Sequence, residues 1–180
     1  MEINYNNILG QGVDGIVYQG NYFDKKVAIK IIDYDVIYTN SDDKLSNNDK
    51  INQFKQINQI ASDNYFGLYI FDIIDNWEEK KIYLIMEKLD YDLEEWCKIQ
   101  KKLNNNVGEK DILNIINNIK LLMIQNKISI GDDNINNYMC KNDKWYRIDF
   151  TKSYFAKSLN SLAKVDKYLK FNKKFLWCLN

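Results

Sequence analysis

Two observations in the sequence predict an α+β fold in two parts. β-Branched and aromatic residues dominate positions 8–32 and return at 68–74 and 82–86, which indicates a sheet in the first half of the chain. Apolar residues recur at three- and four-residue steps between 51 and 61 and again between 112 and 123, which indicates amphipathic helices. We therefore expect a β-rich part up to about Leu89 and a mainly helical part after it.

Composition restricts the functions open to a chain of this kind. Its 25 Lys and Arg residues balance 25 Asp and Glu residues, which argues against binding nucleic acid or a membrane surface through bulk charge. No apolar run approaches the roughly 18 residues of a membrane span, and the N-terminus lacks a signal-peptide pattern, so a cytoplasmic protein is expected. Histidine is absent, which excludes histidine-dependent catalysis, and Cys97, Cys140 and Cys178 are too scattered for a metal or redox motif.

The first element expected is a hairpin, with residues 1–7 as a lead-in strand. Gly10, Gly12 and Gly15 have the spacing G-x-G-x-x-G and are flanked by apolar, β-prone residues. Glycine lets the backbone turn sharply and approach phosphate oxygens closely. A dinucleotide-binding strand-turn-helix uses the same triplet, but it needs a helix after the third glycine and an acidic residue about 20 positions further on.

The segment after the glycines is instead a second strand, Val27–Ile32, apolar apart from Lys30. The glycine triplet followed by Val-Ala-Ile-Lys resembles the Gly-rich loop and third strand of the protein kinase family. The resemblance implies a single kinase-like domain over 1–180, with an N-lobe at 1–89 and a truncated C-lobe at 90–180. It also implies an ATP site that includes Gly10, Gly12, Gly15, Val17, Ala28 and Lys30, with Lys30 positioning the phosphates.

The next segment should contain a loop and then a helix. The apolar pattern fades from Asp33 to Asp49, which predicts a loop, and Asn48 or Asp49 is a plausible helix cap. In protein kinases this helix supplies a glutamate that pairs with the strand lysine, but residues 31–77 contain no glutamate. Aligning the apolar positions puts Gln53 in that place, with Gln56 or Asp49 as alternatives. An amide there can hydrogen-bond the lysine but brings no charge.

Two strands, at 68–74 and 82–86, are expected on either side of a charged turn. The run that ends with Met86, Glu87, Lys88 and Leu89 resembles the last N-lobe strand of the kinases and the hinge between the lobes. The resemblance implies that Met86 lies beside the adenine and that backbone groups of Glu87 and Leu89 hydrogen-bond its edge. Asp92 either reaches the ribose or caps the helix that comes after it.

The second half carries the residues that the resemblance links to chemistry. A helix is expected at Asp111–Gln125, with its apolar stripe in the core. Beyond it, Asp132 and Asn137 have the spacing of the kinase catalytic loop, and a strand at Trp145–Ile148 leads to Asp149-Phe150-Thr151 in the place of Asp-Phe-Gly. The resemblance implies that Asp132 orients or deprotonates the acceptor hydroxyl, while Asn137 and Asp149 bind Mg²⁺ through oxygen atoms.

The same stretch departs from the family pattern. Ile130 and Gly131 stand where the family has histidine and arginine, Asn134 replaces a lysine, and Thr151 replaces glycine. A Gly-Asp loop resembles that of atypical and small-molecule kinases such as aminoglycoside phosphotransferases. Without proline, the Ala-Pro-Glu motif that closes a kinase activation segment cannot exist. A last helix is expected within 159–175.

We expect ATP- and Mg²⁺-dependent phosphoryl transfer to a hydroxyl acceptor, in the first instance serine or threonine on a protein substrate. One alternative is a pseudokinase that acts as a nucleotide-binding or scaffolding module for a protein partner. The other is a small-molecule kinase, which the Gly-Asp loop suggests.

Overall fold

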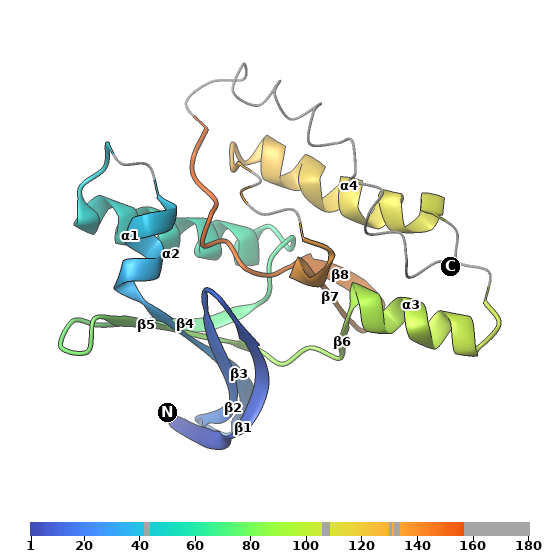
Figure 1. The fold of residues 1–180 in the computed structure, drawn as a ribbon, viewed down its shortest axis with the longest axis horizontal. Coiled ribbons are helices and arrows are strands. Elements are labelled where there is room, and N and C mark those ends of the chain that lie inside the picture. Colours follow the sequence, from blue (N-terminus) through green and yellow to red (C-terminus); the bar gives the residue numbers. More distant parts are fainter. Residues whose placement is uncertain (42–43, 106–108, 130, 132–133, 157–180) are drawn as a thin grey trace.

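The computed structural model describes residues 1–41, 44–105, 109–129, 131 and 134–156, and all structural statements concern these. They form an α+β structure with antiparallel sheets, so the predicted class is confirmed (Figure 1). The larger sheet has the order β1-β2-β3-β5-β4. Its strands are β1 (Glu2–Gly12), β2 (Gly15–Tyr22), β3 (Lys25–Asp33), β4 (Ile70–Asn76) and β5 (Lys81–Glu87).

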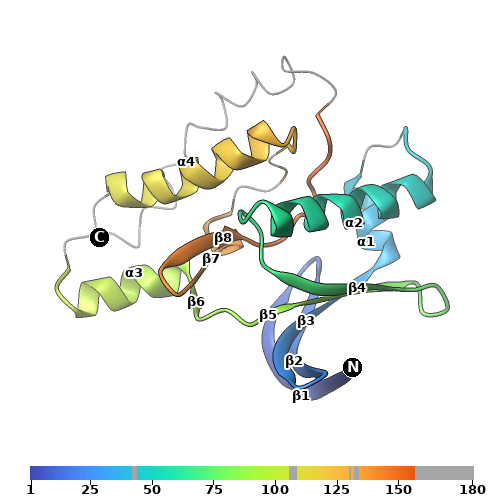
Figure 2. The same ribbon diagram turned by 180° about the vertical axis from the view of Figure 1, so that it is seen from behind.

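A smaller sheet and the remaining helices complete the described chain. The small sheet has the order β6-β7-β8, formed by β6 (Tyr91–Asp92), β7 (Tyr138–Lys141) and β8 (Lys144–Arg147). The helices are α1 (Tyr34–Asn40), α2 (Asn47–Asp63), α3 (Leu93–Lys102) and α4 (Glu109–Gln125). Helices α3 and α4 lie beside the small sheet and away from the first three strands (Figure 1 and Figure 2).

The predicted hairpin is confirmed as β1 and β2, which pair up to the turn where Gly12 faces Gly15. Gly15 has φ +146°, and a Cβ built on it would lie 2.3 Å from the Ile31 carbonyl oxygen. Both the backbone angle and this close approach require glycine, because any side chain would push β2 away from β3. The predicted lysine strand is confirmed as β3, paired with β2 on one side and β5 on the other.

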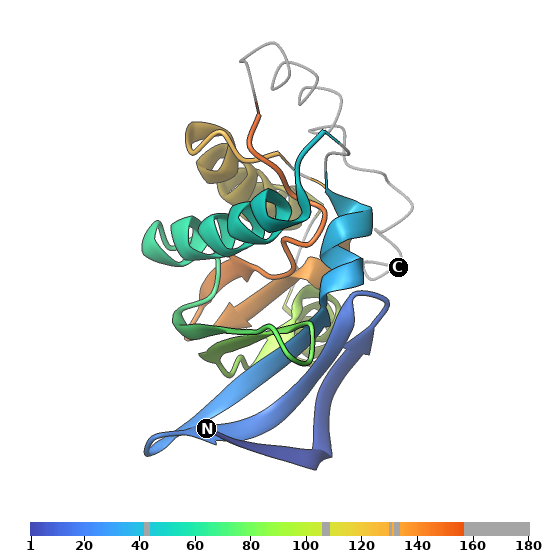
Figure 3. The ribbon, with the colours of Figure 1, turned by 90° about the vertical axis from the view of Figure 1, so that its left-hand side faces the viewer.

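Both faces of the large sheet carry apolar side chains, because alternate residues of β3 and β5 point to opposite sides. On one face α1 and α2 pack against Ile32, Ile82 and Leu84 (Figure 3). On the other face Val27 and Ile29 are buried with Tyr83 and Ile85, among partly buried residues of β1, β2 and β4. The face that α1 and α2 cover is also the face turned toward the second half of the chain.

Two predictions for residues 33–49 are wrong. The expected loop contains α1, whose Tyr34 and Ile37 are buried against α2 and the sheet. The run is only seven residues long, too short to show helical periodicity in the sequence. Helix α2 begins earlier than expected, and its cap is Ser46, whose Oγ accepts a hydrogen bond from the Asp49 amide at 3.2 Å. Serine followed three residues later by an acidic residue is the usual capping pattern.

The other predicted elements are confirmed with small shifts at their ends. Strand β4 begins at Ile70 rather than at residue 68, and the helix expected at Asp111–Gln125 is α4. Asp92 caps α3 by accepting a hydrogen bond from the Glu95 amide at 2.7 Å. The helix predicted within 159–175 lies outside the described residues. No helix in the described part of the chain is long and apolar enough to cross a membrane.

One buried cluster joins the two halves of the chain. Ile57 and Ala61 of α2 pack with Ile116 and Met123 of α4 and with Phe150. The backbone makes the same connection, because the Arg147 amide at the end of β8 donates a hydrogen bond to the Phe66 carbonyl at 2.7 Å. Helix α2 therefore fixes the large sheet against the segment that carries Asp149.

Candidate functional site

A cleft of about 700 Å³ lies between the large sheet and the second half of the chain. That volume is within the usual range for small-molecule sites, about 300–1,000 Å³. The cleft is lined by every predicted site residue that the structure describes, namely Gly10, Gly12, Gly15, Val17, Ala28, Lys30, Met86, Glu87, Leu89, Asn137 and Asp149. The remaining one, Asp132, lies outside the described residues.

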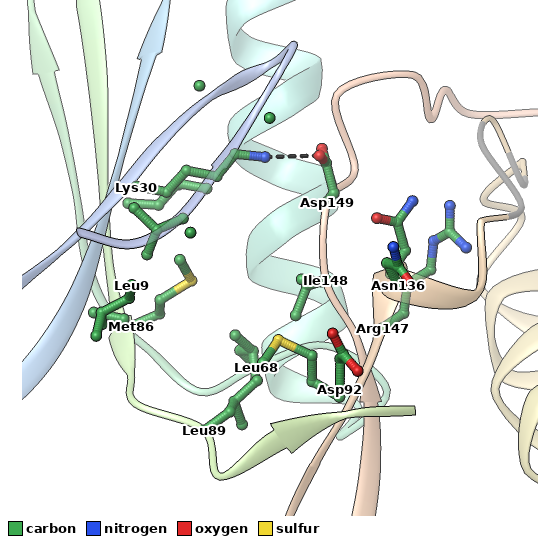
Figure 4. Close-up of a pocket in the computed structure, with 18 of the residues that line it drawn as sticks. Leu9, Lys30, Leu68, Met86, Leu89, Asp92, Asn136, Arg147, Ile148 and Asp149 are labelled. Atoms are coloured by element: carbon green, nitrogen blue, oxygen red, sulfur yellow. Dashed lines mark ion pairs between the residues drawn. The ribbon is translucent and has the colours of Figure 1, made fainter. Parts of the chain in front are cut away.

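One end of the cleft is apolar. Ala28 and Met86 face each other across the β3–β5 ladder, which brings both side chains to the same face of the sheet. They are buried with Leu68, and Val17, Leu89, Tyr146 and Ile148 pack around them. Figure 4 shows Leu68, Leu89 and Ile148 facing Met86 across this end. The arrangement is a slot with apolar walls that ends at the connection between β5 and β6.

The other end of the cleft holds an ion pair. Nζ of Lys30, on β3, lies 2.9 Å from Oδ2 of Asp149, which comes after β8 (Figure 4). Lys30 is only 8% exposed, so this cation is held largely out of water. Asp149 has φ +66°, a conformation that few residues other than glycine, asparagine and aspartate adopt. Strained backbone of this kind is concentrated at functional sites.

The charge of Asp149 depends on its neighbours. Burial alone would raise the pKa of this carboxyl group. The attraction of Lys30, and hydrogen bonds from Lys30 and from the Thr151 hydroxyl and amide, outweigh burial and lower the pKa below its ordinary value. Asp149 is therefore an anion at neutral pH, and it lies at the polar end of the cleft.

The hairpin tip reaches this same point. The Thr151 Oγ1 atom lies 2.7 Å from Oδ1 of Asp149 and 2.8 Å from Oδ2 of Asp14, the residue that precedes Gly15 in the glycine turn. Asp14 also accepts a hydrogen bond from the Asn40 side chain at the end of α1, at 3.3 Å. The hairpin is thus connected across the cleft to the segment that carries Asp149.

Asn137 lies close to Asp149, since its carbonyl accepts a hydrogen bond from the Ile148 amide at 2.8 Å. Across this region, Gly131 packs so closely that a Cβ built on it would lie 1.9 Å from the Lys152 carbonyl oxygen. A side chain at 131, such as the arginine of the kinase pattern, would require the backbone to move. Among the described residues, no group of three or more Asp, Glu, Cys or His side chains is arranged to hold a metal ion.

The prediction that Gln53 of α2 stands beside Lys30 is wrong, because Lys30 pairs with Asp149 and Gln53 has another partner. Gln53 Oε1 accepts a hydrogen bond from the Phe155 amide at 2.9 Å, so Gln53 binds the segment that lies beyond Asp149. Gln56 is exposed, and Asp49 lies in the first turn of α2 beside its cap. The residues that α2 contributes to the cleft are Phe54 and Asn58.

The connection between the two halves is held by contacts next to the apolar end. The Glu87 carboxylate pairs with Lys141 of β7 at 2.6 Å, and the Asp90 amide donates to the Cys140 carbonyl at 3.1 Å. Asp92 lines the cleft while it caps α3, which favours the capping alternative of the two predicted for it.

Several residues in the cleft or next to it were not predicted from the sequence. Asp14 occupies a variable position of the glycine pattern, and Asn58 lies on an otherwise apolar helix face, so neither carries a local signal. Thr151 differed visibly from the expected glycine, but its partner Asp14 is 137 positions away. Only the folded chain brings these residues together.

No family profile matches the chain, and no curated protein is significantly similar to it. Function is therefore inferred from the cleft and from the order of the motifs along the chain.

Proposed function

We propose that the chain is a protein-kinase-like phosphotransferase, with an N-lobe formed by the large sheet, α1 and α2 and a reduced C-lobe formed by the rest. It transfers a phosphoryl group from ATP to a hydroxyl acceptor, in the first instance a protein serine or threonine. The observation that carries the proposal is the Lys30–Asp149 pair beneath a glycine hairpin, in one cleft with an apolar slot. Lys30 and Asp149 are more than 100 positions apart in the sequence, yet they lie side by side in the cleft, in agreement with the order of the motifs along the chain.

The glycine hairpin fits a phosphate ligand better than it fits internal packing. A Cβ built on Gly10 or on Gly12 would meet no atom within 4 Å. The fold itself therefore does not explain glycine at these two positions, in contrast to Gly15, which is enclosed by β3. Close approach of phosphate oxygens to a bare backbone would explain it.

The two ends of the cleft match the two ends of a nucleotide. The apolar slot between Ala28, Met86 and Leu68 suits the flat face of a purine. Lys30, at the opposite end, supplies a cation at a fixed position for the phosphates. Glu87 and Leu89 line the cleft at the edge of the slot. The Glu87 amide donates to the Tyr69 carbonyl at 3.0 Å, so in this proposal the Glu87 carbonyl and the Leu89 backbone hydrogen-bond the purine edge.

The donor set also suits magnesium. Asn137 and Asp149 contribute amide and carboxylate oxygens, and a cation that keeps several waters and shares phosphate oxygens needs few protein ligands. When bound, magnesium neutralises charge that develops on the phosphates. Asp149 is ready for this role as an anion, and Lys30 holds its carboxylate in place. In this proposal Asp132 orients the acceptor hydroxyl and takes its proton.

A second candidate is a pseudokinase, a nucleotide-binding or scaffolding module without transfer activity. It is favoured by Gln53, which takes the sequence place of the C-helix glutamate and binds Phe155 rather than Lys30. Retention of an aspartate at 132 favours the enzyme.

The test is thermal unfolding with adenosine, ADP or ATP, each with and without Mg²⁺, for the natural chain and Asp149→Asn. A ligand that binds only the folded state adds about 2.7 kcal/mol at a hundredfold excess over its Kd. We expect ATP with Mg²⁺ to stabilise the natural chain and Asp149→Asn to lose the magnesium-dependent part. The absence of a shift with every nucleotide would refute the enzyme and the nucleotide-binding form of the pseudokinase, and would leave the scaffolding module. Phosphoryl transfer to a mixture of hydroxyl acceptors, lost in Asp132→Asn, then separates the enzyme from the pseudokinase.

A further inference from the structure

Asp14 points into the cleft although it belongs to an exposed turn. Its neighbour at the tip of the hairpin, Val13, is 97% exposed, whereas Asp14 is half-buried and contacts Thr151 and Asn40. A turn aspartate usually hydrogen-bonds its own backbone nearby. Here the carboxylate instead crosses to a residue on the opposite side of the cleft, which indicates a role beyond forming the turn.

The contact with Thr151 brings two carboxylates close together. The Thr151 hydroxyl is within hydrogen-bond distance of both Asp14 and Asp149, but it has one proton and can donate to only one of them at a time. Lys30 is the one cation that the described residues place in an ion pair with either carboxylate. Lys30 pairs with Asp149, so Asp14 places a second carboxylate beside this ion pair, in a cleft that Lys152 and Arg147 also line.

The negative charge of Asp14 acts on a nearby phosphate ligand according to the ligand's own charge. A nucleoside triphosphate without a metal ion carries several negative charges, and Asp14 repels it at short range. A divalent cation on the phosphates reverses the sign of the interaction, because the carboxylate then faces a cation. An uncharged nucleoside fills only the apolar slot and is indifferent to Asp14.

Building on the proposed function, we propose that Asp14, held in place by Thr151, is a specificity-determining residue that selects metal-bound nucleotide over free nucleotide. The kinase pattern has glycine at position 151, which has no hydroxyl to hold Asp14. Thr151 therefore positions the Asp14 carboxylate, and Asp14 supplies the negative charge.

The experiment measures the Kd of ATP with and without Mg²⁺ by calorimetry and takes their ratio as the magnesium dependence. The variants are Asp14→Asn, which keeps the shape and removes the charge, Thr151→Val, which removes the hydroxyl, and Thr151→Ser, which keeps it. Asp24→Asn, in the exposed β2–β3 turn, is the matched control for loss of one aspartate. Adenosine is the uncharged reference ligand.

We expect Asp14→Asn to lower the magnesium dependence about tenfold, within the ordinary range for coupling between two ligands, and to leave adenosine binding unchanged. Thr151→Val alone should also lower the magnesium dependence, but it should have little further effect when it is combined with Asp14→Asn. Thr151→Ser should have the same magnesium dependence as the natural chain. The inference is overturned if Asp14→Asn and Asp24→Asn show the same magnesium dependence as the natural chain while ATP still binds. If the natural chain binds neither adenosine nor ATP, the nucleotide site itself is refuted and the inference with it.

Discussion

The two ends of the cleft are built in different ways. The apolar end comes from the register of neighbouring strands, since Ala28 and Met86 are paired across β3 and β5. The polar end comes from segments that meet only in the folded chain, with Lys30 on β3 and Asp149 after β8. Strand register is specified by the hydrophobic pattern of many residues along both strands. A few long-range contacts specify the polar end, so single substitutions should disturb it most.

The largest effect is expected for Lys30→Met, which leaves Asp149 partly buried without its cation. Breaking a partly exposed pair of this kind should lower the free energy of unfolding by about 1–3 kcal/mol, less than the loss for a fully buried pair. In the proposed site, ATP affinity in the presence of Mg²⁺ should fall at least about a hundredfold, the upper range for coupling between sites. Urea unfolding and calorimetry measure the two effects, with exposed Lys26→Met as the control.

The acid stability of the same variant provides a second readout. In the natural chain the pKa of Asp149 is lowered, so its contribution to stability is present above the ordinary carboxyl pKa of about 3.9 and is lost as pH falls through the lower folded value. Without Lys30 the attraction that lowers this pKa is removed, so Asp149 contributes less stability at neutral pH and less is lost on acidification. The difference in unfolding free energy between Lys30→Met and the natural chain should therefore shrink as the pH falls. Identical acid unfolding curves, apart from a constant offset, would contradict the assigned electrostatics.

A pair of glycine substitutions sharpens the contrast between internal packing and ligand binding. Gly131→Ala introduces a Cβ that would lie 1.9 Å from the Lys152 carbonyl oxygen, and it should destabilise the fold by about 1–3 kcal/mol. A Cβ at position 12 would meet no atom within 4 Å, so Gly12→Ala should change the free energy of unfolding by no more than about 0.5 kcal/mol. In the proposed site Gly12→Ala should nevertheless weaken ATP binding, while adenosine binding is retained.

Urea unfolding of both glycine variants, followed by calorimetry of the stable one, separates these effects. Equal losses of stability would show that Gly12 is structural after all. An unchanged ATP affinity in Gly12→Ala would remove the glycine hairpin from the phosphate site.

The sequence predicts those parts of the structure that have local patterns. Strands β3 and β5 are predicted by their runs of β-branched and aromatic residues, helix α4 is predicted by helical periodicity, and the glycine turn is predicted by its spacing. The prediction failed at α1, whose two buried residues, Tyr34 and Ile37, make too short a pattern. It also failed for contacts between distant segments, such as Asp14 with Thr151, because either partner alone is an ordinary polar residue in a loop.

The same limit applies to Gln53, for which the predicted element is right and the predicted partner is wrong. Helical periodicity located α2, but the choice between Lys30 and Phe155 depends on how the segment after Asp149 packs on the helix. That segment is fixed from the other side as well, since the Ser129 amide donates to the Tyr154 carbonyl at 2.9 Å.

The smallest effect is therefore expected for Gln53→Ala, which removes one of several contacts to this segment. Loss of a single side-chain acceptor for the Phe155 amide should cost about 0.5–1.5 kcal/mol of unfolding free energy. Gln53→Glu should keep the stability of the natural chain, because a carboxylate also accepts a hydrogen bond from a backbone amide. Gln56→Ala, on the exposed face of the same helix, should have almost no effect on the free energy of unfolding. Of these three variants, only Gln53→Ala should show faster hydrogen exchange of the Phe155 amide than the natural chain. Equal exchange in Gln53→Ala and Gln56→Ala would mean that Gln53 does not hold the segment, and that α2 is linked to Asp149 through the apolar core.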